Sequence, residues 1–262
     1  MGTSFSELIG GANVSGEKVA FHIPEDWMQG RTTYGGLSAA LCLETTNLTF
    51  SDLPPLRSAL VSFIGPAGGD VTGEARILRK GKSVTFVEAD IIGEKGLATR
   101  TVFAFGAGRD SLFDTTFTPK PPLKSPDLCE PYIPEGFGPA FSQRFESRLV
   151  SGARPYAGSD CHDHYIWVRH REPNTDSIAA LIAIADMPPP AVMPMLKELA
   201  AISSMTWMMN IVTEKPTTKD GWWLLQSRAE SAIAGYSSQD MLVWNVDGDL
   251  VIAGRQSVAV FA

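Results

Sequence analysis

The sequence predicts an α+β protein made of two similar halves, each an antiparallel sheet wrapped around one apolar helix. Three observations support this class. An apolar segment of helical length occurs once in each half, at 35–48 and 176–187. A consecutive series of strand-like runs follows each of these segments. A proline-rich segment divides the 262 residues almost in half.

The dividing segment covers residues 107–140. Proline fixes φ and has no backbone N–H to donate, so dense prolines favour an extended linker with little regular structure. We therefore expect a first repeat at 1–106, this linker, and a second repeat at 141–262. The seven prolines are Pro119, Pro121, Pro122, Pro126, Pro131, Pro134 and Pro139.

The strand-like runs correspond between the halves. Each half has four runs after its helix, with a turn before the last run. Asp247-Gly248 forms this turn in the second half, and Asp-Gly between apolar runs is a strong hairpin signal. Consecutive strands joined by short turns pair antiparallel. The runs are 56–65, 70–80, 82–92 and 97–105, then 203–212, 221–231, 238–246 and 250–261; further runs at 18–23, 145–150 and 164–170 precede the helices.

The apolar helices explain why the sheet should wrap around them. Residues 178–185 are apolar without interruption. In a protein outside the membrane, a helix that is apolar on every side must be buried on every side. A curved antiparallel sheet around each helix meets that requirement.

Composition excludes several classes of protein. Hydrophobic residues make up 44% and charged residues 19%, which excludes a disordered chain. The net charge of −7 leaves no basic excess for nucleic acid. No apolar stretch is long enough to span a membrane, and three scattered cysteines form no disulfide or zinc framework. The N-terminus lacks the pattern of a secretory signal, so we expect a cytoplasmic protein.

Three segments in order along the repeats resemble a known family: QGRTTYGGL at 29–37, WLL at 223–225, and DGDLVIAGRQ at 247–256. The chain is similar to the type II, medium- and long-chain acyl-CoA thioesterases. The resemblance implies a tandem (double) hotdog fold. It also implies hydrolysis of acyl-CoA by a bound water, without a metal, another cofactor or a covalent intermediate.

Thioester hydrolysis requires donors where the carbonyl oxygen becomes an oxyanion. The resemblance assigns these donors to backbone amides at the start of the first helix, at Gly36 and Leu37, with Tyr34 and Gly35 beside the substrate. Free N–H groups at a helix start favour negative charge. A glycine pair also suits a tight strand-to-helix turn, so both explanations remain open.

The resemblance assigns the side chains that hold the water to the second repeat. The Gln, Thr and Asp of the family fall on Gln256, Ser231 and Ser204. Strand alternation is expected to point Gln256 towards the helix, within water-bridging reach of Ser204 or Ser231. A serine is no carboxylate base, so activity at Ser204 is in doubt. Asp186, at the end of the second helix, is the nearest alternative carboxylate, although capping a turn is the ordinary role of an acid there. The position equivalent to Gln256 in the first repeat is predicted to be Arg100.

Two polar clusters have simpler explanations. Arg79, Lys80 and Lys82 form a basic hairpin that could meet coenzyme A phosphates, or could be a solvated turn. His162 and His164 alternate on a strand without a third ligand, so we expect surface or hydrogen-bonded histidines rather than a metal site.

Three functions compete for this sequence. The first is an acyl-CoA thioesterase, and the second is a non-catalytic protein that binds acyl-CoA. A hotdog hydratase ranks last, because neither helix contains a histidine. The expected partner is the acyl-CoA substrate. Exposed sheet edges and apolar strand faces also favour a homodimer or a higher homo-oligomer.

Overall fold

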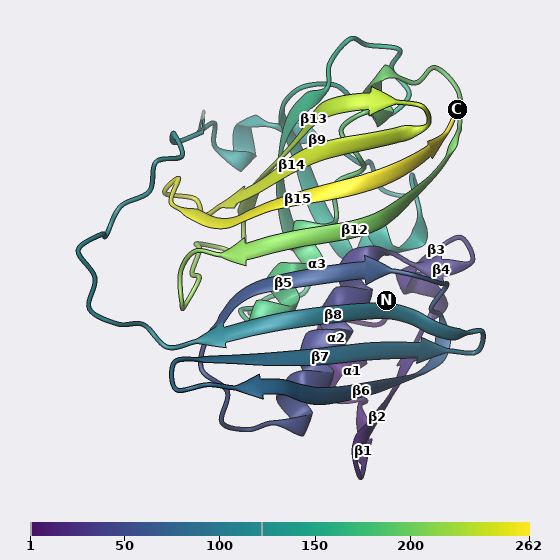
Figure 1. Cartoon of the computed structure of the whole chain (residues 1–262). Helices are drawn as coiled ribbons and strands as arrows, with labels where there is room; N and C mark the ends of the chain where they lie inside the picture. The colour runs from purple at the N-terminus through teal and green to yellow at the C-terminus, as the bar shows by residue number, and fades with distance from the viewer. Residues whose placement is uncertain (1, 122) are drawn as a thin grey trace.

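The protein is described by a computed structural model of residues 2–121 and 123–262, so Met1 and Pro122, the latter within the predicted linker, lie outside it. Thirteen strands form one antiparallel sheet in the order β1-β2-β6-β7-β8-β5-β12-β15-β14-β13-β11-β10-β9. The sheet curves around the helices, and the two halves of the chain occupy its two ends (Figure 1). The antiparallel sheet and its buried helices confirm the predicted fold class, and the sheets predicted for the two halves form one continuous sheet.

The elements of the first half follow the predicted runs closely. They are α1 (Phe5–Gly10), β1 (Asn13–Ser15), β2 (Lys18–Ile23), the 3₁₀ turn η1 (Glu25–Trp27), β3 (Met28–Gln29), β4 (Thr32–Thr33), α2 (Gly35–Thr49), β5 (Leu56–Phe63), β6 (Gly69–Lys80), β7 (Val84–Gly93) and β8 (Gly96–Gly106).

The second half repeats the order of helix and then four strands. Its elements are the 3₁₀ turn η2 (Pro126–Leu128), β9 (Glu130–Pro131), the 3₁₀ turn η3 (Ala140–Arg144), β10 (Phe145–Ser151), β11 (Asp163–His170), α3 (Ile178–Ala185), the 3₁₀ turn η4 (Met193–Met195), β12 (Ala201–Ile211), β13 (Trp223–Ile233), β14 (Tyr236–Trp244) and β15 (Leu250–Phe261).

The segment between the halves has little regular structure. Its described residues from 107 to 140 hold only η2, β9 and the first residue of η3. β9 pairs with β10, where Pro131 lies opposite Arg148. The segment therefore joins the sheet of the second half before the predicted end of the linker.

The two halves are joined through β5 and β12. Five residue pairs connect these strands, and Leu60 opposite Met208 is the middle pair. On the inner face of the sheet, α2 and α3 pack against each other (Figure 1). The halves therefore share one continuous sheet and one helix-to-helix contact.

The buried helices keep their polar groups satisfied. Thr45 and Thr46 in α2 donate their hydroxyls to the carbonyls of Leu41 and Cys42, one turn earlier. Ser177 caps α3, accepting a hydrogen bond from the amide of Ala180 at 3.1 Å. Every residue from Ala179 to Ala185 is buried, as the apolar run predicts. In the described ranges, no helix has the length and apolar character needed to cross a membrane.

Candidate active site

The N-terminus of α2 meets the C-terminus of α3 at a pair of glycines. A Cβ added at Gly35 would lie 2.7 Å from Oδ2 of Asp186. A Cβ added at Gly36 would lie 2.8 Å from the carbonyl oxygen of Ala183 and 3.0 Å from the Asp186 Cβ. Only glycine permits this approach. The tight packing and the proximity to a carboxylate are therefore consequences of the same two residues.

Asp186 is the C-cap residue of α3 and points towards the start of α2. Its Oδ1 accepts a hydrogen bond from Nε2 of Gln256 at 2.7 Å, and the Gly36 amide lies near enough to lower the pKa of the carboxyl group. Asp186 keeps partial solvent exposure although protein atoms surround it on most sides. The carboxylate therefore lies between the two halves of the chain.

The surroundings of Asp186 bring its proton equilibrium close to neutral pH. Desolvation raises the pKa of the carboxyl group to about 7, although the hydrogen bond from Gln256 and the nearby Gly36 amide oppose the rise. Burial disfavours the charged form, whereas a donated hydrogen bond favours it. A carboxylate with this pKa can accept a proton from water near neutral pH.

Gln256 belongs to a buried pair of glutamines on the inner face of the sheet. It lies on β15 opposite Gln239 of β14, and only 2% of its surface is exposed. Nε2 of Gln239 donates to Oε1 of Gln256 at 2.9 Å. Strand alternation predicted that Gln256 faces the helices, and its bond to Asp186 shows that it does.

Comparison with known proteins places this geometry in a family. Residues 23–106 match the model of the acyl-CoA thioesterase N-terminal domain, and residues 122–260 match that of the C-terminal domain. The chain belongs to the acyl-CoA thioesterase family. No curated protein matches the sequence significantly.

Solved structures similar to this thioesterase-family chain show the hotdog fold. A hot dog fold protein from Alicyclobacillus acidocaldarius has a TM-score of 0.90 and 22% identity, covering 100% of this chain and 99% of its own. The acyl-CoA thioesterase II TesB2 from Mycobacterium marinum has a TM-score of 0.76 and 17% identity, covering 98% of both chains. The tesB protein of Mycobacterium avium subs paratuberculosis has a TM-score of 0.79 and 14% identity, covering 99% and 100%.

Tyr34 is buried and has a structural role, and its contact with substrate stays a prediction. Only 2% of its surface is exposed, and its hydroxyl donates to the Ala183 carbonyl at 3.0 Å. Its ring stacks on Phe141 with centroids 4.0 Å apart. Tyr34 therefore ties the end of α3 to the start of α2. The Leu37 side chain is also fully buried, so it could act only through its backbone amide.

The two serines predicted beside the water occupy different faces of the sheet. Ser204 lies opposite Val258, on the face of Gln256, but the carboxylate bonded to Gln256 is Asp186. Ser231 is exposed and lies opposite Ser238. An irregularity in β13 just before Ser231 turns its side chain to the face opposite Gln256. The expectation that Ser231 neighbours Gln256 is therefore wrong.

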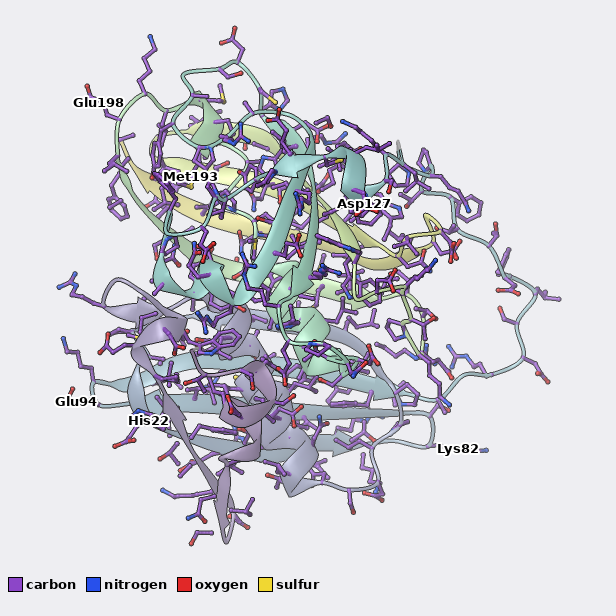
Figure 2. All side chains as sticks on the ribbon, turned by 180° about the vertical axis from the view of Figure 1, so that it is seen from behind. His22, Lys82, Glu94, Asp127, Met193 and Glu198 are labelled. Carbon is purple, nitrogen blue, oxygen red and sulfur yellow. The ribbon has the colours of Figure 1, made fainter. Side chains whose placement is uncertain are left out.

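The basic hairpin lies away from the helix ends that meet. Lys80 pairs with Asp52 at 3.1 Å, just beyond the C-terminus of α2. The 15 residues of α2 span roughly 22 Å, so Arg79, Lys80 and Lys82 lie at the opposite end of this helix from Gly35. Figure 2 shows Lys82 at the outer margin of the molecule. The structure does not bring these predicted substrate contacts to the site.

Arg100 and His164 also differ from the sequence expectations. Arg100 forms two hydrogen bonds with Asp90, at 2.8 and 2.6 Å, and is no inward-facing counterpart of Gln256. His162 contacts the Ala229 carbonyl at 3.0 Å, as expected for a hydrogen-bonded strand residue. His164 is fully buried, and neither ring nitrogen has a hydrogen-bond partner in the described structure. Within residues 2–121 and 123–262, no cluster of three potential ligands could hold a metal ion.

Sequence reasoning missed Gln239. A hairpin centred on Asp247-Gly248 pairs residues whose numbers add to the same total, and this register sets Gln239 opposite Gln256. The turn that identified the hairpin therefore carried the signal for its buried partner.

Proposed function

We propose that the protein hydrolyses acyl-CoA thioesters to free acid and coenzyme A by direct attack of water. The observation that carries the proposal is the Asp186 carboxylate, which has a pKa of about 7 and lies against the first turn of α2. A proton acceptor and amide donors at one point are what thioester hydrolysis requires. Membership of the acyl-CoA thioesterase family supports this reaction.

In the proposed mechanism, water attacks the thioester carbonyl carbon and Asp186 takes its proton. The Leu37 amide at the start of α2 stabilises the oxyanion, with help from the helix dipole, whereas the Gly36 amide faces Asp186. When the carbon–sulfur bond breaks, protonated Asp186 returns the proton to the leaving thiolate. Gln256 holds the carboxylate in place and favours its charged form.

The scaffold for this chemistry is inferred to be a tandem hotdog. α2 with β5 to β8 and α3 with β12 to β15 have the same order of elements. The hotdog fold of the similar structures supports this division. One repeat then supplies the helix amides, and the other supplies Asp186 and Gln256.

The alternative of a non-catalytic acyl-CoA binder arose because Ser204 is no carboxylate. Asp186 provides a carboxylate beside Gln256, which removes the reason for preferring that alternative.

The test is thiol release from acyl-CoAs of several chain lengths, measured with an Ellman-type reagent. We expect turnover by the natural protein and a loss of about 10²-fold or more in Asp186→Asn. The matched control is Asp176→Asn, an exposed carboxylate just before α3, which should keep full activity. Turnover that is unchanged in Asp186→Asn would contradict the mechanism. No thiol release from any chain length would contradict the function.

A further inference from the structure

A line of three hydrogen bonds runs from the backbone to the proposed general base. The amide of Ala191 donates to Oε1 of Gln239 at 2.8 Å. Nε2 of Gln239 donates to Oε1 of Gln256 at 2.9 Å, and Nε2 of Gln256 donates to Oδ1 of Asp186 at 2.7 Å. Gln239 and Gln256 are 1% and 2% exposed, so water does not compete for these groups.

The backbone end of this line sets its direction. A glutamine side chain can turn over and exchange its donor and acceptor, but a backbone N–H only donates. Ala191 therefore requires Oε1 of Gln239, which leaves the NH₂ group of Gln239 facing Gln256. Gln256 must then accept on one side and present its own NH₂ group to Asp186.

The segment after Asp186 explains why the donor is Ala191. Met187 donates its amide to the Ile184 carbonyl, and residues 188–190 are prolines without an N–H. Ala191 is thus the next residue with an amide to donate. Ala191 is buried, and the three prolines restrict the backbone between it and Asp186. The position of this donor relative to Asp186 is therefore restricted.

We propose that Gln239 is a positioning residue, which orients the Gln256 amide so that it donates to Asp186 and keeps that carboxylate in its ionised form. The role in catalysis rests on the proposed function, whereas the orientation does not. Oδ1 is engaged by Gln256, so the water gives its proton to Oδ2, the oxygen that faces Gly35.

The groups facing Asp186 come from three elements. β15 contributes Gln256, β5 contributes Phe63 beside Gly35, and the start of α2 contributes Tyr34. Tyr34 is the titratable member, and burial raises its pKa well above the usual value, so it stays uncharged near neutral pH. A change in the Asp186 titration therefore reports on its hydrogen bonds.

Two substitutions separate orientation from space filling. Gln239→Met keeps the length of the side chain but removes the amide, which frees Gln256 to turn over. Gln239→Glu can only accept when ionised, so it draws the NH₂ group of Gln256 away and turns Oε1 towards Asp186. The Asp186 pKa should rise in both variants, and more in Gln239→Glu. The matched control is Gln226→Met, because Gln226 is also a nearly buried strand glutamine but bonds to Asp163.

The titration is followed by ¹³C NMR of the Asp186 carboxyl group and by the acid limb of kcat/KM. We expect a rise of about one pH unit in Gln239→Met, a larger rise in Gln239→Glu, and no change in Gln226→Met. In a Gln256→Ala background, Gln239→Met should cause no further rise, since the path to Asp186 is already broken.

Equal titration of Asp186 in the natural protein and in either folded Gln239 variant would overturn the proposal, and so would an undiminished effect of Gln239→Met without Gln256. If Gln239→Met does not fold, Gln239→Glu and Gln239→Asn carry the same test. The NMR titration needs no substrate. An absence of thiol release with the expected NMR shifts would therefore contradict the proposed function and leave the orienting role of Gln239 in place.

Discussion

Gly35 and Gly36 differ in what a single methyl group would meet. At Gly36 the methyl would press on the buried ring of Tyr34 and on the backbone carbonyl of Ala183, which can move only if α3 shifts. At Gly35 it would meet the ends of two side chains, Asp186 and Phe63, which can rotate. The two positions therefore separate stability from activity.

We expect Gly36→Ala to lose about 1–3 kcal/mol of stability together with activity, as overpacked sites do. Gly35→Ala should unfold close to the natural protein but lose at least tenfold in hydrolysis, because the displaced carboxylate no longer holds the water. Urea unfolding and thiol release measure the two effects. A Gly36→Ala protein of unchanged stability would show that the helix ends do not approach so closely.

The acid dependence of hydrolysis should report the Asp186 carboxyl group. Its pKa of about 7 means that protonation removes the general base as the pH falls below neutral. We expect kcat/KM to fall about tenfold for each unit of pH below that value. This fall in kcat/KM at acid pH should be absent from the residual activity of Asp186→Asn. A rate that is flat between pH 8 and pH 5 would assign the proton transfer to another group.

At the scale of elements, β6 passes close to α2 at Gly73. A Cβ at Gly73 would come within contact distance of the Thr45 side chain, whose hydroxyl is committed to the Leu41 carbonyl. Thr45 is fully buried, and its hydrogen bond to the Leu41 carbonyl holds its side chain in place. The strand can therefore pass the helix only at a glycine.

Gly73→Ala should therefore lower the free energy of unfolding by about 1–3 kcal/mol, since α2 or β6 must shift. Gly10→Ala is the control, because a Cβ there meets nothing within 4 Å. Urea unfolding of the two variants should show a loss only in the first. Equal stability would mean that β6 can move away from the helix at little cost.

Strand and helix order could be predicted from the sequence, because apolar periodicity and turn residues are local signals. The face that each residue occupies was predictable only where a strand stays regular. It succeeded for Gln256 on β15. It failed for Ser231, because the irregularity before that residue in β13 reverses the alternation. The sequence pointed to Asp186 as an alternative carboxylate, because it lies at the end of the second helix. Its neighbours Gln256 and Gly36 lie 70 and 150 residues away in sequence, so no local pattern predicts them.

At the scale of the whole molecule, buried titratable groups make stability depend on pH. Burial lowers the pKa of His164 and His170 from 6.5 to about 4, so both stay neutral in the folded state. Their contribution to stability is complete above pH 6.5 and is lost as the pH falls towards 4. Asp186 acts in the opposite sense: its pKa of about 7 lies above the ordinary 3.8, so the folded state gains its proton first.

These groups predict a measurable difference between two proteins. Between pH 6 and pH 4.5 the two histidines weaken the natural protein as the pH falls, and Asp186 offsets about half of that loss. Asp186→Asn removes the offset. The free energy of unfolding of this variant should therefore fall more steeply, by an extra amount on the order of 1 kcal/mol for each unit by which the pH falls. Urea unfolding at several pH values measures both slopes. Parallel slopes would show that Asp186 does not titrate in this range.

The junction of the two halves has a consequence for the number of sites. A local twofold axis through the Leu60–Met208 pair superposes β5 on β12 and β8 on β15, because Ala59 lies opposite Met209 and Val61 opposite Trp207. Gln256 lies opposite Trp207, and Phe103 lies opposite Ala59. The rotation therefore carries Gln256 onto Phe103, and Gln239 onto Val87, which pairs with Phe103.

Both of these counterparts are apolar and fully buried. Phe103, and not Arg100, is thus the residue that mirrors Gln256. A second carboxylate in the first half would need an amide at the position of Phe103 to orient it, and Phe103 has a phenyl ring instead. Although the order of elements occurs twice, the glutamine pair that orients the proposed general base occurs once, and titration with a tight-binding inhibitor should count one site per polypeptide.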